Sequence, residues 1–114
     1  MDRQALGREA EARAEAMLLA QGLTLVQRNY RCRGGEIDLI MRDDGQLVFV
    51  EVRYRRSASH GGALASVDAH KRRRLINAAQ HYLLTSRWAG PCRFDVVGLG
   101  GGGAGQWVRD AFTV

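Results

Sequence analysis

The chain has 114 residues, of which 46% are hydrophobic and one is proline, and its formal net charge is +5. This length suits one domain over residues 1–114 with a single core, and the composition excludes a disordered or fibrous chain. No apolar run approaches the length of a membrane span and no apolar signal segment follows the start. We therefore expect a cytoplasmic protein with no membrane partner.

The first helix is expected to run from an N-cap at Asp2 to about Gly22, which stands where a C-terminal glycine is favoured. Its apolar stripe consists of Leu6, Ala10, Ala14, Met17 and Leu18. Residues 23–29 alternate in the manner of a strand. The loop YRCRGG follows, with Arg31 and Arg33 in it.

A hairpin is predicted for residues 34–55, GGEIDLIMRDDGQLVFVEVRYR, with Asp44-Gly45 as a two-residue type I′ loop. The two residue numbers of every cross-strand pair then add up to 89. One face is wholly apolar and is expected to be core; it contains Ile37, Leu39 and Met41 against Val48, Val50 and Val52. On the other face, Asp38 lies opposite Glu51, where two charged carboxylates destabilise a sheet.

After the hairpin the chain enters a loop-like segment, RRSASHGGALAS, and then a helix capped by Ser66 or Asp68 that ends near Ser86. Its buried stripe is Leu75, Ile76, Ala79, Tyr82 and Leu83. Strands are expected at 92–99 and 106–112, joined by a glycine-rich loop over residues 98–105. The order α-β-β-β-α-β with one more strand indicates a mixed α/β (α+β) fold, with helices packed on a central mixed sheet.

The charge distribution and the few cysteines and histidines limit the partners and metal sites that the chain can have. Residues 1–51 carry nine acids and seven bases, whereas residues 52–114 carry three acids and ten bases. The basic half favours a polyanionic partner, most often nucleic acid, although a solvated basic surface without a partner fits the same composition. Cys32 and Cys92 lack the spacing of zinc ligands, so we expect free thiols. The three histidines, His60, His70 and His81, also show no ligand spacing.

The opposed acids Asp38 and Glu51 have two explanations. In the first, they form surface ion pairs that contribute little stability, with one or more of Arg31, Arg33, Arg42 and Arg53. In the second, they bind Mg²⁺, which prefers oxygen ligands and is commonly held by one or two carboxylates with water and phosphate. The backbone carbonyl of Val52 is a further candidate ligand, and Arg53 is placed to hold a phosphate. Glu36 is either a further ligand or the cross-strand partner of Arg53, and the salt bridge with Arg53 is favoured.

The same residues resemble a known signature. Asp38, followed after twelve residues by Glu51-Val52-Arg53, resembles the PD-(D/E)xK motif of restriction-endonuclease-like folds, whose core has the order αβββαβ. More closely, GREAEARA, RNYRCRGGEIDLI, VFVEVRYR and RFDVV resemble the YraN family of uncharacterised bacterial proteins. This resemblance covers nearly the whole chain. The family is similar in turn to archaeal Holliday-junction resolvases, which implies a homodimer.

The resemblance implies that Asp38 and Glu51 are metal ligands and that Arg53 stands where the motif has lysine. A lysine can help to deprotonate water, whereas arginine stays protonated and can only stabilise developing charge. Glu11 matches an additional acid of resolvase-like members, with a solvated helix acid as the alternative. Lys71, the single lysine of the chain, is a candidate substitute for the motif lysine or a phosphate contact.

The leading hypothesis is a Mg²⁺- or Mn²⁺-dependent endonuclease that acts on structured DNA. Phosphate contacts are expected from a set of arginines: Arg31, Arg33, Arg55, Arg56, Arg72, Arg73 and Arg74. The first rival is a nucleic-acid-binding module without catalysis, in which Arg53 only anchors phosphate. The second is a protein-interaction scaffold whose basic surface meets an acidic partner.

Overall fold

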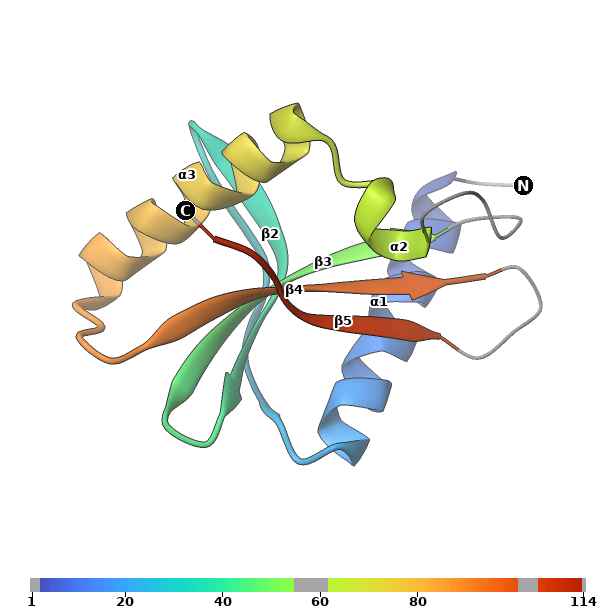
Figure 1. The fold of residues 1–114 in the computed structure, drawn as a ribbon, viewed down its shortest axis with the longest axis horizontal. Coiled ribbons are helices and arrows are strands. Elements are labelled where there is room, and N and C mark those ends of the chain that lie inside the picture. The colour runs from blue at the N-terminus through green and yellow to red at the C-terminus, as the bar shows by residue number, and fades with distance from the viewer. Residues whose placement is uncertain (1–2, 55–61, 101–104, 114) are drawn as a thin grey trace.

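The computed structural model describes residues 3–54, 62–100 and 105–113, and the elements follow one another around a single five-stranded sheet (Figure 1). They are α1 (Arg3–Ala20), β1 (Thr24–Cys32), β2 (Gly35–Asp43), β3 (Gln46–Tyr54), α2 (Gly62–Ala65), α3 (Ala69–Ser86), β4 (Cys92–Leu99) and β5 (Gln106–Phe112). The strand order is β1-β2-β3-β4-β5, in which β3 and β4 are parallel and the other neighbours antiparallel. The expected mixed α/β fold is confirmed.

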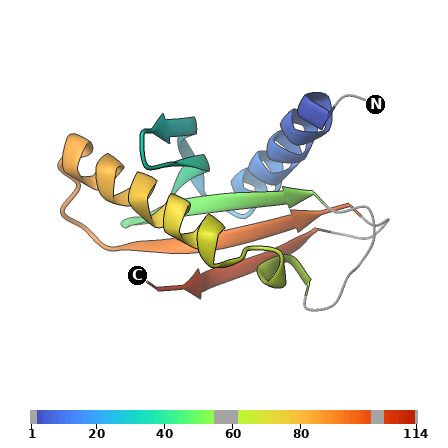
Figure 2. The same cartoon turned by 90° about the horizontal axis from the view of Figure 1, so that it is seen from above.

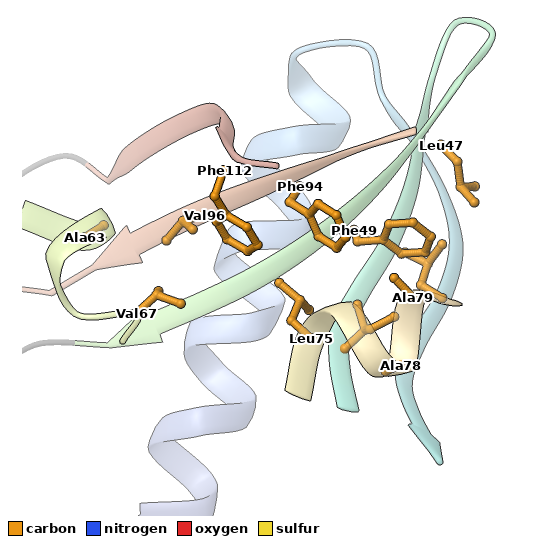
Figure 3. Close-up of a cluster of buried hydrophobic side chains, with 12 residues drawn as sticks. Leu47, Phe49, Ala63, Val67, Leu75, Ala78, Ala79, Phe94, Val96 and Phe112 are labelled. Carbon is orange, nitrogen blue, oxygen red and sulfur yellow. The ribbon is translucent and has the colours of Figure 1, made fainter. Parts of the chain in front are cut away.

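The two long helices pack on different faces of the sheet, and each covers its own core (Figure 2). On the α1 face, Ala10, Ala14 and Leu18 are buried against the sheet. On the α3 face, Leu75 and two alanines of α3 pack against aromatic side chains of the strands, as Figure 3 shows for Phe49, Phe94 and Phe112. The sheet is therefore covered on both sides, and its interior strands read as nearly continuous apolar runs.

Both helices end and begin much as predicted. Gly22, with φ 96°, follows α1 in the left-handed conformation that favours glycine. The predicted N-cap Asp2 lies outside the described residues. Asp68 caps α3, because its side chain accepts a hydrogen bond from the Lys71 amide. The α3 stripe is confirmed and also includes Ala78, which is fully buried.

A short helix, α2, replaces part of the segment that was expected to be a loop. Ala63 is buried there, and its amide donates a 2.9 Å hydrogen bond to Gln106 Oε1 on β5. The Cβ of Ala63 lies so close to β4 that a Cβ added to Gly98 would come within 2.5 Å of it. The contact with β4 and β5 stabilises a single helical turn that the sequence pattern alone does not reveal.

β1 is longer than predicted, and the expected YRCRGG loop is wrong for residues 30–32, which continue the strand. The chain reverses at Arg33-Gly34, with Cys32 paired with Gly35. Tyr30 holds this extension against α3 through an edge-to-face contact with Tyr82, at 5.2 Å between ring centroids.

The β2–β3 hairpin has the predicted register from Asp43↔Gln46 to Leu39↔Val50. The two-residue loop is also confirmed, but type I′ is wrong at its second position. Asp44 has φ 57°, whereas Gly45 is not in the positive-φ region. One left-handed residue is enough to reverse the chain here without altering the pairing on either side.

Strands β4 and β5 have the predicted bounds, and the middle of the glycine-rich loop between them, residues 101–104, lies outside the described residues. Asp95 of β4 is fully buried and accepts hydrogen bonds from Arg93, the Trp107 indole and the Asp110 amide. This network ties β5 to β4. Among the described helices, none is long and apolar enough to cross a membrane.

Candidate functional site

The alternation of side chains along β2 reverses around Asp38. Leu39 and Met41 lie in the core beneath α1, as expected for alternate residues of a strand. Ile37 and Ile40, however, both lie in the core beneath α3, although an odd spacing should place them on opposite faces. The prediction that Ile37 shares a face with Leu39 and Met41 is therefore wrong.

The backbone around Asp38 explains this reversal. In the β1–β2 register, Asn29 falls opposite Asp38 and has φ 52°, a conformation that interrupts a regular strand. On the other side, the amide of Val52 donates a 2.8 Å hydrogen bond to Asp38 Oδ2. A carboxylate thus takes a hydrogen bond from β3 just beyond the last pair of the described β2–β3 register, Leu39↔Val50.

Asp38 and Glu51 meet at this point, and their side chains are hydrogen-bonded to each other. Burial and the charge of Glu51 raise the pKa of Asp38 to about 8, against the opposing effects of the Val52 amide and Arg53. Burial also raises the pKa of Glu51, while Asp38, Arg53 and Lys71 act in the opposite direction. Two carboxyl groups so arranged titrate as a coupled pair and resist carrying two negative charges at once.

Arg53 lies beside the acid pair but does not neutralise it fully. Its Nη1 is 3.6 Å from Glu51 Oε2, and its Nε donates a 3.2 Å hydrogen bond to Ser66 Oγ. The predicted pairing of Glu36 with Arg53 is wrong. Glu36 instead pairs with Arg74 of α3, 2.6 Å from Nη2 to Oε2.

A hollow that we name the α3 cleft opens above Glu51, with a volume of about 290 Å³. Its lining consists of Glu36, Glu51, Asp68, His70, Lys71 and Arg74. Lys71 thus lies in the same hollow as Glu51, and its charge lowers the pKa of both Glu51 and Glu36. The sequence pattern gave His70 no role, and its adjacency to Lys71 in the first turn of the helix was the signal that could have found it.

A second hollow, which we name the α1 cleft, lies between α1 and β1. Its lining consists of Gln4, Gly7, Arg8, Glu11, Asn29 and Arg31. Burial and the charge of Asp38 raise the pKa of Glu11, whereas a hydrogen bond from the Asn29 side chain and the charge of Arg31 lower it. Glu11 therefore lies close enough to Asp38 for their charges to interact, and it lies on the face of the sheet opposite α3.

The predicted phosphate contacts divide into two groups. Arg72 and Arg74 take part in the fold: Arg72 Nε donates to the Val67 carbonyl and lies over the Phe112 ring, and Arg74 pairs with Glu36. Arg31, Arg33 and Arg73 are exposed, and Arg55 and Arg56 lie outside the described residues. Of the other candidates for neutralising the acids, Arg42 donates to the Asp44 carbonyl instead.

The donor set at Asp38 and Glu51 fits a hydrated divalent cation. Over residues 3–54, 62–100 and 105–113, no group of three or more His, Cys, Asp or Glu side chains is arranged to hold a metal. Mg²⁺ and Mn²⁺ accept fewer protein ligands, because water and substrate phosphate complete their coordination. Two carboxyl groups with raised pKa values, beside the backbone of Val52, match that open type of site rather than a closed structural one.

Comparison with known proteins places this chain in a family. Residues 10–99 match the sequence model of the uncharacterised protein family UPF0102. A UPF0102 protein of Alcanivorax borkumensis is 54% identical over 93% of this chain and 90% of its own. A second, of Methylococcus capsulatus, is 54% identical over 92% and 88%. A third, of Cupriavidus taiwanensis, is 56% identical over 96% and 84%. The chain belongs to the UPF0102 family.

Proposed function

We propose that this chain binds structured DNA and hydrolyses a phosphodiester bond with Mg²⁺ or Mn²⁺ held by Asp38 and Glu51. The observation that carries the proposal is the carboxyl pair of Asp38 and Glu51, which lies just beyond Leu39↔Val50, the last pair of the β2–β3 register. Two half-buried acids side by side destabilise the fold when both are charged, and a divalent cation removes that penalty. A surface ion pair with Arg53 does not account for a pKa of about 8 at Asp38.

The order of the elements supports the proposal. A helix, three strands, a helix and a strand parallel to β3 follow one another in the chain, with the short α2 inserted. The restriction-endonuclease-like core has the same order, and its two acids stand on neighbouring strands, as Asp38 and Glu51 do here. This likeness of fold raises the expectation of nuclease chemistry, and the acid pair supplies the specific residues.

The surrounding residues have distinct roles in this proposal. A bound divalent cation would supply a nucleophilic hydroxide and neutralise charge on the scissile phosphate. Arg53 remains protonated, so it holds a phosphate oxygen and bears developing negative charge rather than accepting a proton. Lys71 shares the α3 cleft with Glu51, and in this proposal it orients water.

The test is a cleavage assay with labelled branched and single-stranded DNA in Mg²⁺, Mn²⁺ or EDTA. We expect cleavage by the wild type with either metal, loss of at least about a hundredfold for Glu51→Gln, and a smaller loss for Lys71→Ala. Glu9→Gln is the matched control, since Glu9 is an exposed acid of α1. Equal activity of Glu51→Gln and Glu9→Gln would reject Asp38 and Glu51 as the catalytic site.

A binding module without catalysis is the second candidate. It is favoured by Arg53, whose guanidinium lies 3.6 Å from Glu51 and cannot act as a base. This candidate expects DNA binding that persists in EDTA and in Glu51→Gln, with no cleavage of any substrate in either metal.

A further inference from the structure

The α1 cleft and the α3 cleft are connected by a third hollow. This connecting hollow is lined by Arg31, Cys32, Gly35, Glu36 and Arg74. It shares Arg31 with the α1 cleft and shares Glu36 and Arg74 with the α3 cleft. The three hollows therefore form a series that starts beside α1, passes over the end of β1 and reaches Glu51 beneath α3.

The α1 cleft offers positive charge that the fold does not use. Arg28, which borders the neighbouring hollow along α1, is held by Glu15 at 2.6 and 2.8 Å. Arg8, by contrast, makes no side-chain ion pair or hydrogen bond with any residue that the structure describes. Arg31 is exposed and interacts with Glu11 and Glu36 only through longer-range attraction. Both guanidinium groups are therefore available to an anion.

Gly7 keeps the wall of this cleft open. A Cβ built on Gly7 has no neighbour within 4 Å, so the absence of a side chain is not required by packing. Glycine inside a helix lowers stability by about 1 kcal/mol relative to alanine. The α1 helix thus presents bare backbone beside Arg8, where another molecule can approach closely.

The lining favours a polymer of regularly spaced anions. No Phe, Tyr or Trp is among the described residues that line the three hollows, and His70 of the α3 cleft is the one aromatic ring among them. Arginine, lysine and amide groups instead suit phosphate oxygens. Contacts of this kind recognise the backbone and are independent of base sequence.

From these observations we infer that the α1 cleft is a second subsite for the sugar–phosphate backbone of a single nucleic-acid strand, held by Arg8 and Arg31. The strand runs from the α1 cleft over the end of β1 into the α3 cleft, and so passes the acid pair. The inference rests on the proposed function, because it identifies where the strand bound at Asp38 and Glu51 continues.

The experiment measures binding of a fluorescently labelled oligothymidine by anisotropy in EDTA over a range of salt concentrations. For Arg8→Ala we expect about tenfold weaker binding at low salt, from the loss of a charge-assisted hydrogen bond. The slope of log affinity against log salt should decrease by about 0.7, the value for one phosphate contact on a single strand. Arg13→Ala, an exposed arginine of the same helix outside the clefts, should match the wild type.

A second variant tests whether the strand enters the α1 cleft, because it fills the cleft without changing the charge of the cleft. In Gly7→Leu the new Cβ has no neighbour within 4 Å. Replacing a glycine inside a helix should raise the melting temperature, while the leucine side chain should weaken binding by obstructing the cleft. Loss of affinity in a stabilised protein cannot result from unfolding. An oligoadenine probe should give the same ranking of the variants, because the contacts are to the backbone.

Three outcomes would overturn the inference. Equal weakening by Arg8→Ala and Arg13→Ala would indicate diffuse attraction by the basic surface. Unchanged affinity of Gly7→Leu would show that the strand does not enter the cleft; if Glu51→Gln still abolished cleavage, the proposed function would stand without this subsite. Absence of oligothymidine binding by the wild type at low salt would remove the inference, whereas cleavage of branched DNA would still support the proposed function.

Discussion

Asn29 and Asp38 decide where the candidate site forms. The positive φ of Asn29 and the hydrogen bond from the Val52 amide to Asp38 interrupt the regular strand pattern at this point of the sheet. The meeting of Asp38 and Glu51 could be predicted from the sequence, because the Asp44-Gly45 turn fixes the register. The reversal at Asp38 could not be predicted, because the hydrophobic pattern of a sequence does not depend on the backbone angle of a single asparagine.

The pKa of Asp38 predicts how stability depends on pH. The folded-state pKa is about 8, whereas an aspartate in an unfolded chain titrates near about 3.9. Between these values the folded state retains a proton that the unfolded state has lost, so the free energy of unfolding decreases as pH rises. The largest slope from one such group is about 1.4 kcal/mol per pH unit.

Thermal melts in EDTA between pH 5 and pH 9, a range of about four units around this window, check the prediction. The wild type should melt at progressively lower temperature toward pH 9. Asp38→Asn keeps an acceptor for the Val52 amide and should show a flatter profile. Parallel profiles for the two proteins would mean that Asp38 titrates normally.

At the scale of elements, glycine controls how closely α3 approaches β2. A Cβ on Gly35 would lie 1.8 Å from the Arg74 carbonyl oxygen, which is an impossible contact. We expect Gly35→Ala to destabilise the fold by about 1–3 kcal/mol, as overpacking does, because α3 must move away from the sheet. Gly7→Ala is the control and should stabilise by up to about 1 kcal/mol. Chemical denaturation measures both, and equal effects would contradict this account of Gly35.

The buried Asp95 network gives a second prediction for the elements. Arg93 is 11% exposed and donates to both Asp95 and Asp43. Asp95→Ala should cost about 3 kcal/mol or more, because it leaves Arg93 and the Trp107 indole without their buried acceptor. Asp43→Ala, which removes a more exposed carboxylate, should cost about 1 kcal/mol or less. Urea unfolding measures the free energy of unfolding of both variants. Similar losses of stability in the two would argue against a buried structural role for Asp95.

The elements themselves were largely predictable, and the exceptions share a cause. α1, α3, β4 and β5 follow hydrophobic periodicity with clear ends, and the structure reproduces their predicted positions within a few residues. The short α2 and the extension of β1 are stabilised by contacts with distant segments, Gln106 for α2 and Tyr82 for β1. Such tertiary contacts override local composition and cannot be read from a window of sequence.

At the scale of the whole molecule, the sheet separates the two helices while the clefts connect their faces. The parallel pairing of β3 with β4 requires a long crossover, which α2 and α3 provide. The resulting arrangement brings Glu11 toward Asp38 from one face and Lys71 toward Glu51 from the other. Sequence reasoning proposed each of these residues separately, but their placement on opposite faces depends on the assembled sheet.

The basic surface predicts a property of the whole molecule. If the exposed arginines hold phosphates, log affinity for DNA should fall linearly with log salt, with a slope of about 0.7–0.9 for each phosphate contact. Anisotropy titrations at several salt concentrations give this slope for the wild type. Affinity that does not change with salt would exclude the basic residues as the binding surface.

The central claim is that Asp38 and Glu51 form a cation site, and thermal melts of wild type and Glu51→Gln in EDTA and in Mn²⁺ test it most directly. The account predicts that Glu51→Gln melts higher than wild type in EDTA, because the mutation removes one of two half-buried acids that repel each other. It also predicts that Glu51→Gln loses the stabilisation that Mn²⁺ gives the wild type. A Glu51→Gln protein that melts lower in both buffers, with a wild type that Mn²⁺ leaves unchanged, would contradict the account and make the acids members of a structural ion-pair network.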